Sequence, residues 1–335
     1  MNARVSAVSY YLPEDVLTNA DLHEAFPEWS VDKIADKTGI GRRHIAKPDE
    51  FSSDLAISAA HALFREHDIS PEAIDYLIVC TQSPDYYLPT TACIVQDALG
   101  LRKTVGAVDI NLGCSGYIYA LGQAKGLIES GQVENVLVIT ADTYTKFINK
   151  EDKSVRTIFG DGSAATFVTS DGASEGIYGV TYGTDGSGAK HLIVPRGGLR
   201  TGEQLAPKSS AELRELNKGS FDLYMDGPEI FNFTLRVVPG ALEGVLESAG
   251  LGIDEIDLFV FHQANAFMLE HLRKKLGVAS EKFFVSLAES GNTVSSTIPI
   301  ALADAKEQGV LVSGMKVLLL GFGVGLSWGG LVLDW

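Results

Sequence analysis

The sequence predicts an α/β fold in which short, buried strands alternate with helices along the whole chain. Apolar runs bounded by polar turns are separated by segments with helical periodicity. Similar segments also return in the same order in the second half of the chain. With 335 residues, the chain is long enough for two halves that each bury a core.

The strand-like runs are nearly continuous in apolar character, which is typical of strands buried on both faces of a sheet. In the first half they cover residues 76–81, 106–112, 135–140 and 164–170. In the second half they cover residues 177–183, 258–263, 282–287, 316–322 and 326–335.

Three pairs of segments suggest an internal duplication: residues 69–84 with 251–265, 108–124 with 285–305, and 134–143 with 314–323. The first pair, for example, gives in each copy a helix end, an Ile-Asp pair, an apolar strand and a polar turn. The alternative is that these segments are the common pattern of α/β proteins. A polar turn cluster at 169–176 predicts the seam, which gives an N-terminal half of residues 1–172 and a C-terminal half of residues 173–335.

Composition and charge exclude several classes of protein. The chain has 27 basic and 43 acidic residues, a formal net charge of −16, so a nucleic-acid-binding protein is not expected. No run of 18 apolar residues and no signal peptide is visible, which predicts a cytoplasmic protein without membrane contact. Three widely spaced cysteines predict neither disulfides nor a zinc site.

Cys114 lies between an apolar strand and a helical segment, in the sequence Gly-Cys-Ser-Gly. A cysteine near a helix N-terminus is favoured as thiolate, and its own N–H can stabilise an oxyanion. The flanking glycines leave the approach open and permit unusual φ values. This position suits an activated nucleophile, although a small buried cysteine at a tight turn is the alternative. Cys80 and Cys93 lie in apolar elements, so we expect them only to pack.

In the second half, Asn292 lies on the turn that matches the Cys114 turn, and His262 lies at the end of the strand that matches the one ending near Cys80. Ligand sites in open α/β sheets lie beyond the carboxyl ends of strands, so both side chains can converge on Cys114. Taken singly, His262 could be structural and Asn292 could be a turn or cap residue.

The glycine-rich loop at residues 321–330 superficially resembles a dinucleotide-binding fingerprint. That fingerprint must open a helix, whereas the residues that follow here form another strand-like run. The loop is therefore better suited to offer free N–H groups to an oxyanion.

The ordered motifs YYLPEDVLTNADL, KTGIGRRHIA, PTTACIVQDALG, GCSGYIYAL, FGDGSAA, HQAN, GNTVSSTIP and GFGVGLSWG span nearly the whole chain. Together they resemble the 3-oxoacyl-[acyl-carrier-protein] synthase III family of thiolase-fold condensing enzymes. The resemblance implies a five-layered α-β-α-β-α core made of two duplicated halves, and a homodimer. It also implies a catalytic set of Cys114, His262 and Asn292, with the N–H groups of Cys114 and Val324 forming the oxyanion hole.

The reaction implied by this resemblance is a decarboxylative Claisen condensation. Cys114 takes an acyl group from a thioester, and a malonyl thioester, expected on an acyl carrier protein, then loses CO2. His262 and Asn292 stabilise the enolate, which attacks the acyl-cysteine to give a 3-oxoacyl thioester. The implied partners are the carrier protein and acyl thioesters, and no metal or redox cofactor is expected.

The predicted substrate contacts depart in part from the family pattern. Lys33 stands where the family often has a tryptophan, with Trp29 four residues earlier, and Lys153 stands where it has an arginine. These two changes leave open whether coenzyme A or a carrier protein carries the acyl donor. Phe267 also replaces an arginine. The contacts predicted for coenzyme A or the carrier are Lys33, Lys153, Arg156, Asn265, Phe267, Lys274 and Lys275.

Leu88 and Phe322 are the predicted residues of the acyl pocket. Leu88 replaces an aromatic residue that, in acetyl-selective family members, closes the pocket of the partner subunit. Val324 interrupts a run that is often three glycines, which makes the wall bulkier but keeps the N–H group. The acyl chain therefore stays unassigned.

Two other functions remain open at the level of the sequence. The first is transfer of the Cys114 acyl group to a hydroxyl or amine without decarboxylation, which would leave Asn292 without its enolate role. The second is an inactive partner subunit, but such subunits usually lose the nucleophile. A degradative thiolase would need a second cysteine in the C-terminal glycine loop, but residues 321–329 contain none. A hydroxymethylglutaryl synthase would need a glutamate near the pocket, but residues 89–96 contain none.

Overall fold

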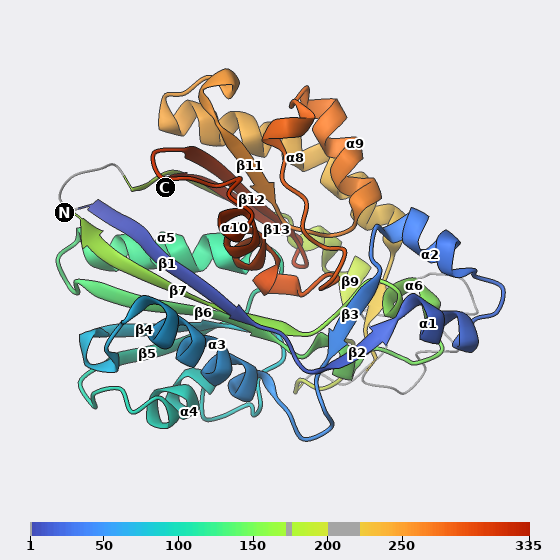
Figure 1. Cartoon of the computed structure of the whole chain (residues 1–335), viewed down its shortest axis with the longest axis horizontal. Coiled ribbons are helices and arrows are strands. Elements are labelled where there is room, and N and C mark those ends of the chain that lie inside the picture. The colour runs from blue at the N-terminus through green and yellow to red at the C-terminus, as the bar shows by residue number, and fades with distance from the viewer. Residues whose placement is uncertain (1, 172–175, 200–221) are drawn as a thin grey trace.

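The computed structural model describes residues 2–171, 176–199 and 222–335. Two β-sheets lie face to face with helices between them and on both outer sides (Figure 1). This is the predicted α/β architecture with five layers, in the order α-β-α-β-α.

The first sheet takes all of its strands from the N-terminal half of the chain. Its order is β1-β7-β6-β4-β5, and the parallel strands β6, β4 and β5 lie at one side. Strand β1 pairs antiparallel with β7 and was not predicted from the sequence. The strands are β1 (Asn2–Tyr11), β4 (Tyr76–Cys80), β5 (Gly106–Ile110), β6 (Asn135–Asp142) and β7 (Gly162–Asp171).

The second sheet repeats this topology with strands of the C-terminal half. In the order β8-β13-β12-β11, the first two pairs are antiparallel and the last is parallel, as in β1-β7-β6-β4. The strands are β8 (Ile177–Thr184), β11 (Leu258–Phe261), β12 (Lys316–Gly323) and β13 (Ser327–Asp334). The predicted boundary between residues 172 and 173 lies outside the described residues, and the division into two domains stays a prediction.

The expected strand at residues 282–287 is wrong. Only a single parallel bridge joins Phe283 to Phe259, at the position that β5 occupies in the first sheet. Further along, the Ser286 N–H donates to the side-chain Oε1 of Gln263 at 2.9 Å instead of to a strand backbone, and this ends the pairing.

The helices form three layers around the sheets. Helices α5 (Gly116–Glu129) and α10 (Thr297–Glu307) lie between the sheets, and α5 contacts strands of both. The outer layers are α3 (Ser52–His67) with α4 (Thr91–Ala98), and α8 (Gly227–Ala249) with α9 (Ala266–Leu276). Because α5 is covered on both sides, its apolar residues extend around much of its surface, as in Tyr117, Ile118, Leu121 and Ala124.

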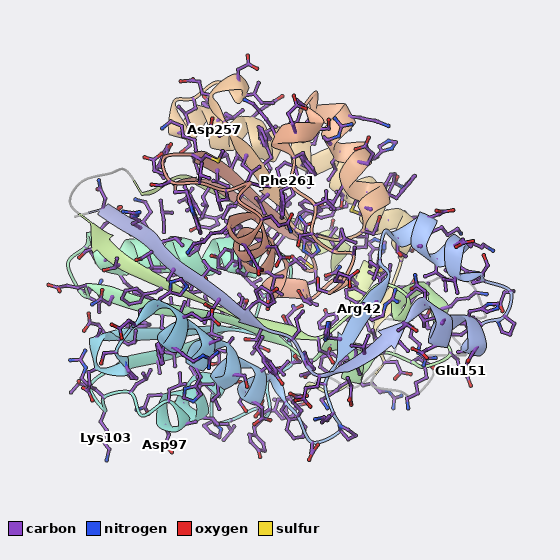
Figure 2. All side chains as sticks on the ribbon, in the orientation of Figure 1. Arg42, Asp97, Lys103, Glu151, Asp257 and Phe261 are labelled. Atoms are coloured by element: carbon purple, nitrogen blue, oxygen red, sulfur yellow. The ribbon has the colours of Figure 1, made fainter. Side chains whose placement is uncertain are left out.

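Side chains fill the space between the layers (Figure 2). Phe261, at the end of β11, points into this packed interior, whereas Asp97 and Lys103 project from the periphery. The central sheets and α5 share one continuous apolar core. Strands such as β6, which are buried over nearly their whole length, need the continuous apolar sequence seen here.

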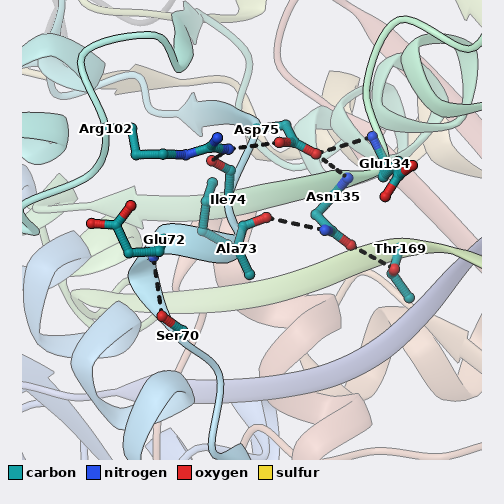
Figure 3. A network of polar contacts seen from close by, with 9 residues as sticks. All are labelled: Ser70, Glu72, Ala73, Ile74, Asp75, Arg102, Glu134, Asn135 and Thr169. Carbon is teal, nitrogen blue, oxygen red and sulfur yellow. Dashed lines mark hydrogen bonds and ion pairs between the residues drawn. The ribbon is translucent and has the colours of Figure 1, made fainter.

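One acidic residue in each half fixes the start of the neighbouring parallel strand. In the first half, Asp75 accepts the N–H groups of Glu134 and Asn135, at 3.1 and 3.0 Å, where β6 begins (Figure 3). In the second half, Asp257 accepts the N–H of Lys316 at 2.8 Å, where β12 begins. The Ile-Asp pairs that matched in the sequence therefore make the same contact twice.

A smaller region lies beside the two sheets, where Figure 1 shows it at one end of the molecule. It contains the hairpin β2 (Asp15–Thr18) and β3 (Arg42–Ile45), with the helices α1 (Asn19–Ala25), α2 (Val31–Thr38) and α6 (Lys153–Arg156). The short strands β9 (Leu192–Ile193) and β10 (Tyr224–Met225) pair nearby. Within the described ranges, no helix has the length and apolar character to span a membrane.

Candidate active site

Cys114, His262 and Asn292 line one cavity of about 170 Å³. Cys114 lies between β5 and α5, His262 directly follows β11, and Asn292 lies in the loop before α10. The three residues come from both halves of the chain, and each is nearly inaccessible to bulk solvent. The structure therefore brings together the three side chains predicted to converge.

The glycines around Cys114 make room for neighbouring side chains. A Cβ on Gly116 would lie 2.3 Å from the sulfur of Cys80, and one on Gly113 would lie 2.5 Å from Oε1 of Gln82. Neither glycine has a positive φ, so the expectation of unusual φ values is wrong. Close packing against Cys80 and Gln82 is instead the reason that residues without a side chain are needed here.

Burial, together with the nearby carboxyl of Asp142, raises the pKa of the Cys114 thiol to about 12. The backbone N–H groups of Cys114 and Val324 act in the opposite direction. The expectation of a lowered pKa is therefore wrong. Cys114 lies two residues before helix α5, and burial outweighs the helix dipole and the N–H groups.

The end of β12 shapes the wall behind the sulfur. A Cβ on Gly323 would lie 2.9 Å from both Cβ and Sγ of Cys114, so only glycine fits there without a shift. Val324 follows and directs its N–H at the sulfur. Its carbonyl accepts from the hydroxyl of Ser327 at 2.8 Å, and that hydroxyl also lies 2.7 Å from the hydroxyl of Ser115. This contact ties the loop to the nucleophile turn, and the two N–H groups can hold a carbonyl oxygen at Cys114.

His262 is held from behind by Thr297, the first residue of α10. Its Nδ1 lies 2.7 Å from the Thr297 hydroxyl, which is also 3.2 Å from the carbonyl oxygen of Val294. Burial lowers the pKa of His262 to about 3, so the imidazole is neutral at physiological pH. No described residue bonds Nε2, which leaves this atom for the cavity.

Asn292 has its amide oriented by its own loop. Oδ1 accepts the N–H of Val294 at 2.9 Å, and Val294 adopts the left-handed conformation with φ 57°. Since Oδ1 is used in this way, Nδ2 is available as a donor to a ligand in the cavity. A non-glycine residue with positive φ is strained, which marks this turn as functionally constrained.

Asp142, which the sequence analysis missed, links the two halves behind the site. At the end of β6 it accepts from the N–H of Gln82 at 2.8 Å and from the N–H and hydroxyl of Ser295. Burial raises the pKa of Asp142 to about 7. Its position at a strand end, like that of His262, is the signal that could have identified it.

The two residues predicted for the acyl pocket lie in different places. Phe322 lines the cavity and meets the ring of His262 edge-on, with centroids 5.7 Å apart. Leu88 is 82% exposed and contacts neither Cys114 nor this cavity within one chain. Its predicted role in a partner subunit stays a prediction.

Lys33, Lys153 and Arg156 gather in the small region around α2 and α6. The ammonium groups of Lys33 and Lys153 lie 5.4 and 5.6 Å from the ring centre of Trp29. Lys153 also pairs with Glu28 at 2.6 Å. Arg156 lies 5.7 Å from the ring of Phe26. The cluster is basic and aromatic, but none of these residues lines the catalytic cavity.

Helix α9 carries the remaining predicted contacts. Asn265 lines the cavity and caps the helix by accepting the N–H of Met268 at 2.8 Å. Phe267 is 60% exposed and stacks on Phe231 at the cavity wall. The ammonium groups of Lys274 and Lys275 each have a polar partner within the chain. That of Lys274 lies 3.1 Å from the carboxylate of Glu270, and that of Lys275 donates to the Leu235 carbonyl at 2.6 Å.

The other two cysteines differ from one another. Cys80 is fully buried and donates to the Leu112 carbonyl at 3.2 Å, as expected of a packing residue. Cys93 is exposed, so the prediction that it packs is wrong. Its position on α4 faces away from the apolar side that Ala92 and Val95 provide. In the described part of the chain, no group of three or more His, Cys, Asp and Glu residues could hold a metal ion.

Comparison with known proteins shows which family has this arrangement. The family model "3-Oxoacyl-[acyl-carrier-protein (ACP)] synthase III" matches residues 108–186, and its C-terminal counterpart matches residues 246–335. The beta-ketoacyl-[acyl-carrier-protein] synthase III of Caldanaerobacter subterraneus is 38% identical over 99% of this chain and 98% of its own length.

Solved structures agree with the sequence matches. A crystal structure of a 3-oxoacyl-(acyl-carrier-protein) synthase III is 44% identical, with a TM-score of 0.94 over the full length of both chains. The synthase III of Thermus thermophilus is 38% identical, with a TM-score of 0.89 over 99% of each chain. The chain therefore belongs to the 3-oxoacyl-[acyl-carrier-protein] synthase III family.

Proposed function

We propose that this protein catalyses the decarboxylative Claisen condensation of an acyl thioester with a malonyl thioester carried on an acyl carrier protein. The observation that supports this function best is the convergence of Cys114, His262 and Asn292 on one cavity, beside two backbone N–H groups. Each group matches one requirement of the reaction: a nucleophile, donors for an enolate and an oxyanion hole.

The first half-reaction loads the acyl group. The thiol proton of Cys114 must leave, and His262 is the one other titratable side chain that lines the described cavity. Neutral imidazole can accept the proton at Nε2 and return it to the thiolate leaving group of the donor. Sγ attacks the thioester carbon while the N–H groups of Cys114 and Val324 hold the oxyanion.

The second half-reaction forms the new carbon–carbon bond. The malonyl carboxylate leaves as CO2, and the electron pair forms an enolate whose oxygen accepts from Nδ2 of Asn292 and Nε2 of His262. The enolate carbon attacks the acyl carbon and expels the Cys114 thiolate, which takes up one proton. Neutral donors in a dry cavity stabilise the enolate without reorganisation, and the balance needs no metal or redox cofactor.

The experiment that tests this function follows acyl-Cys114 and CO2 in the same sample. Enzyme loaded with an acyl thioester should release CO2 from malonyl-carrier protein and give a 3-oxoacyl product of matching mass. If the acyl group moves to a hydroxyl or amine without malonyl thioester, the transfer reaction is the correct function. If the wild-type chain never loads, the inactive-subunit alternative is correct.

We propose that the carrier protein docks on α9 near the mouth of the cavity. Acyl carrier proteins are typically acidic, and the net charge of −16 on this chain makes a local basic patch necessary. Replacing Lys274 and Lys275 with glutamate should raise the KM for carrier-bound substrate and leave loading from a small thioester unchanged. Equal effects on both substrates would place the carrier elsewhere.

We also propose a homodimer in which the loop at residues 85–90 contributes to the interface. Tyr86, Tyr87 and Leu88 are 62%, 75% and 82% exposed. Three consecutive large hydrophobic side chains with this exposure are unusual on a protein surface and are typical of an interaction site. Leu88→Glu should lower the dimer fraction in sedimentation, whereas Lys103→Glu at another surface should not. The cytoplasmic location stays a prediction.

A further inference from the structure

A second cavity of about 330 Å³ adjoins the nucleophile turn. Its described lining is mostly apolar and includes Gln82, Asn111, Tyr144, Phe147, Leu192 and Val324. Cys114 belongs to the same packed cluster as several of these residues, including Tyr144, Leu192 and Val324. We name this space the side cavity.

The side cavity begins one residue away from the nucleophile. The side chains of Gln82 and Val324 both approach Gly113, where a Cβ would lie 2.5 Å from Oε1 of Gln82 and 2.8 Å from Cγ1 of Val324. Val324 is also the residue whose N–H faces the sulfur of Cys114. Leu192 lines both this space and the cavity of Cys114, so an acyl group on Cys114 with its carbonyl oxygen at these N–H groups can extend toward the side cavity.

The side cavity differs from the catalytic cavity in its polar groups. The buried hydroxyl of Tyr144 donates to Oε1 of Gln82 at 3.1 Å. This bond fixes the amide orientation, so the NH2 group of Gln82 is the end available to a ligand. Asn111 is exposed and lines the same cavity. Its side-chain amide makes no hydrogen bond to a described residue.

The electrostatics of the side cavity favour a neutral polar ligand. None of its described lining residues is Lys, Arg, His, Asp or Glu. Asp142 lies directly behind, where it accepts the backbone N–H of Gln82. Burial raises the pKa of Tyr144 well above its usual value, so this hydroxyl stays protonated. Among the described residues an anionic chain would find no cation in the lining of this cavity, and it would lie near the carboxyl group of Asp142.

We infer that the acyl group carried by Cys114 bears a neutral oxygen, a hydroxyl or carbonyl, that accepts a hydrogen bond from the Gln82 amide. The inference rests on the proposed function, because it names the class of acyl group that the same nucleophile takes. A site that hydrogen-bonds a substrate oxygen discriminates strongly against the analogue without it, because its polar groups then stay unpaired.

The test is a competition for Cys114 between N-acetylcysteamine thioesters of 3-hydroxybutyrate, butyrate and succinate, read by intact-protein mass. These probes need no carrier protein and differ in one polar group. We expect the hydroxylated chain to load at least about tenfold faster than butyryl, with succinyl slowest. Butyryl loading as fast as 3-hydroxybutyryl, or faster, would overturn the inference.

Two variants assign the preference to residues. Gln82→Met keeps the length of the side chain and removes the donor, so it should lower the hydroxybutyryl-to-butyryl ratio to about one while butyryl still loads. Tyr144→Phe frees the amide to rotate and should lower the ratio in part. Phe147→Leu, an apolar change in the same lining, should leave the ratio unchanged. An unchanged ratio in both Gln82→Met and Tyr144→Phe would contradict the assignment.

The competition separates this inference from the proposed function. If butyryl loads faster than 3-hydroxybutyryl and CO2 release from malonyl-carrier protein persists, the condensation function stands and the polar acyl group is wrong. If no thioester loads on Cys114, the proposed function itself fails.

Discussion

The backbone N–H of Val294 donates to Oδ1 of Asn292 at 2.9 Å, and this one bond leaves the amide nitrogen for the cavity. We predict that Asn292→Ala still forms acyl-Cys114 but loses malonyl decarboxylation by roughly 10²–10³-fold, because one enolate donor is removed. Asn292→Asp keeps an oxygen for Val294 and should lose decarboxylation as well. Rapid-quench assays of the two half-reactions separate these steps, and equal losses in both would assign Asn292 to loading.

The contact between His262 and Thr297 predicts a role for a hydroxyl that does not line the catalytic cavity. A hydroxyl has one hydrogen, which can go to the carbonyl of Val294 or to Nδ1 of His262. In the first case the hydroxyl oxygen accepts from Nδ1–H, so Nε2 carries a lone pair and can accept a proton, as loading requires. In the second case Nδ1 accepts from the hydroxyl, so the proton of the ring lies on Nε2, which can donate to the enolate. Thr297 is therefore a positioning residue that permits both tautomers.

Thr297→Val keeps the shape and removes this hydroxyl, so we expect the His262 ring to be confined to one tautomer and one half-reaction to slow more than the other. Thr297→Ser should restore the wild-type balance. Nitrogen-15 chemical shifts of His262 report the tautomer directly. Identical shifts and a uniform loss of both half-reactions in Thr297→Val would show a purely structural role.

Gly323 predicts a steric effect on the nucleophile. Gly323→Ala places a Cβ 2.9 Å from Cys114 Sγ, so loading should fall strongly while the fold persists. Gly126→Ala is the matched control in α5, because no atom lies within 4 Å of the added Cβ. That control should load normally and gain about 0.5–1 kcal/mol in free energy of unfolding. Normal loading by Gly323→Ala would place the reactive sulfur elsewhere.

Burial of neutral His262 predicts an acid-sensitive contribution to stability. Its pKa falls from 6.5 to about 3 on folding, so between these values the unfolded chain binds more protons than the folded chain. The contribution is fully present above pH 6.5 and is lost as the pH falls toward 3. In denaturant titrations from pH 7 to 4, wild type should lose stability relative to His262→Gln. A constant difference would contradict this, and His61→Gln at an exposed site is the control.

The strand ends that carry Cys114 and His262 could be predicted because apolar runs and glycine-bearing turns are local signals. The duplicated order of segments also predicted the matching sheets, and the Ile-Asp pairs at Asp75 and Asp257 proved to make equivalent contacts. The pKa of Cys114 could not be predicted, because it depends on burial and on Asp142, which only folding brings near. The side cavity was missed for the same reason, since Gln82 and Tyr144 are far apart in sequence.

The most direct test of the account is the mass of the intact protein after incubation with an acyl thioester. Wild type should gain one acyl group, and peptide mapping should place it on Cys114. Cys114→Ala should gain none, although the buried Cys80 and the exposed Cys93 are both still present. Acylation of Cys114→Ala at the wild-type rate, or an acyl group mapped to Cys80 or Cys93, would contradict the account.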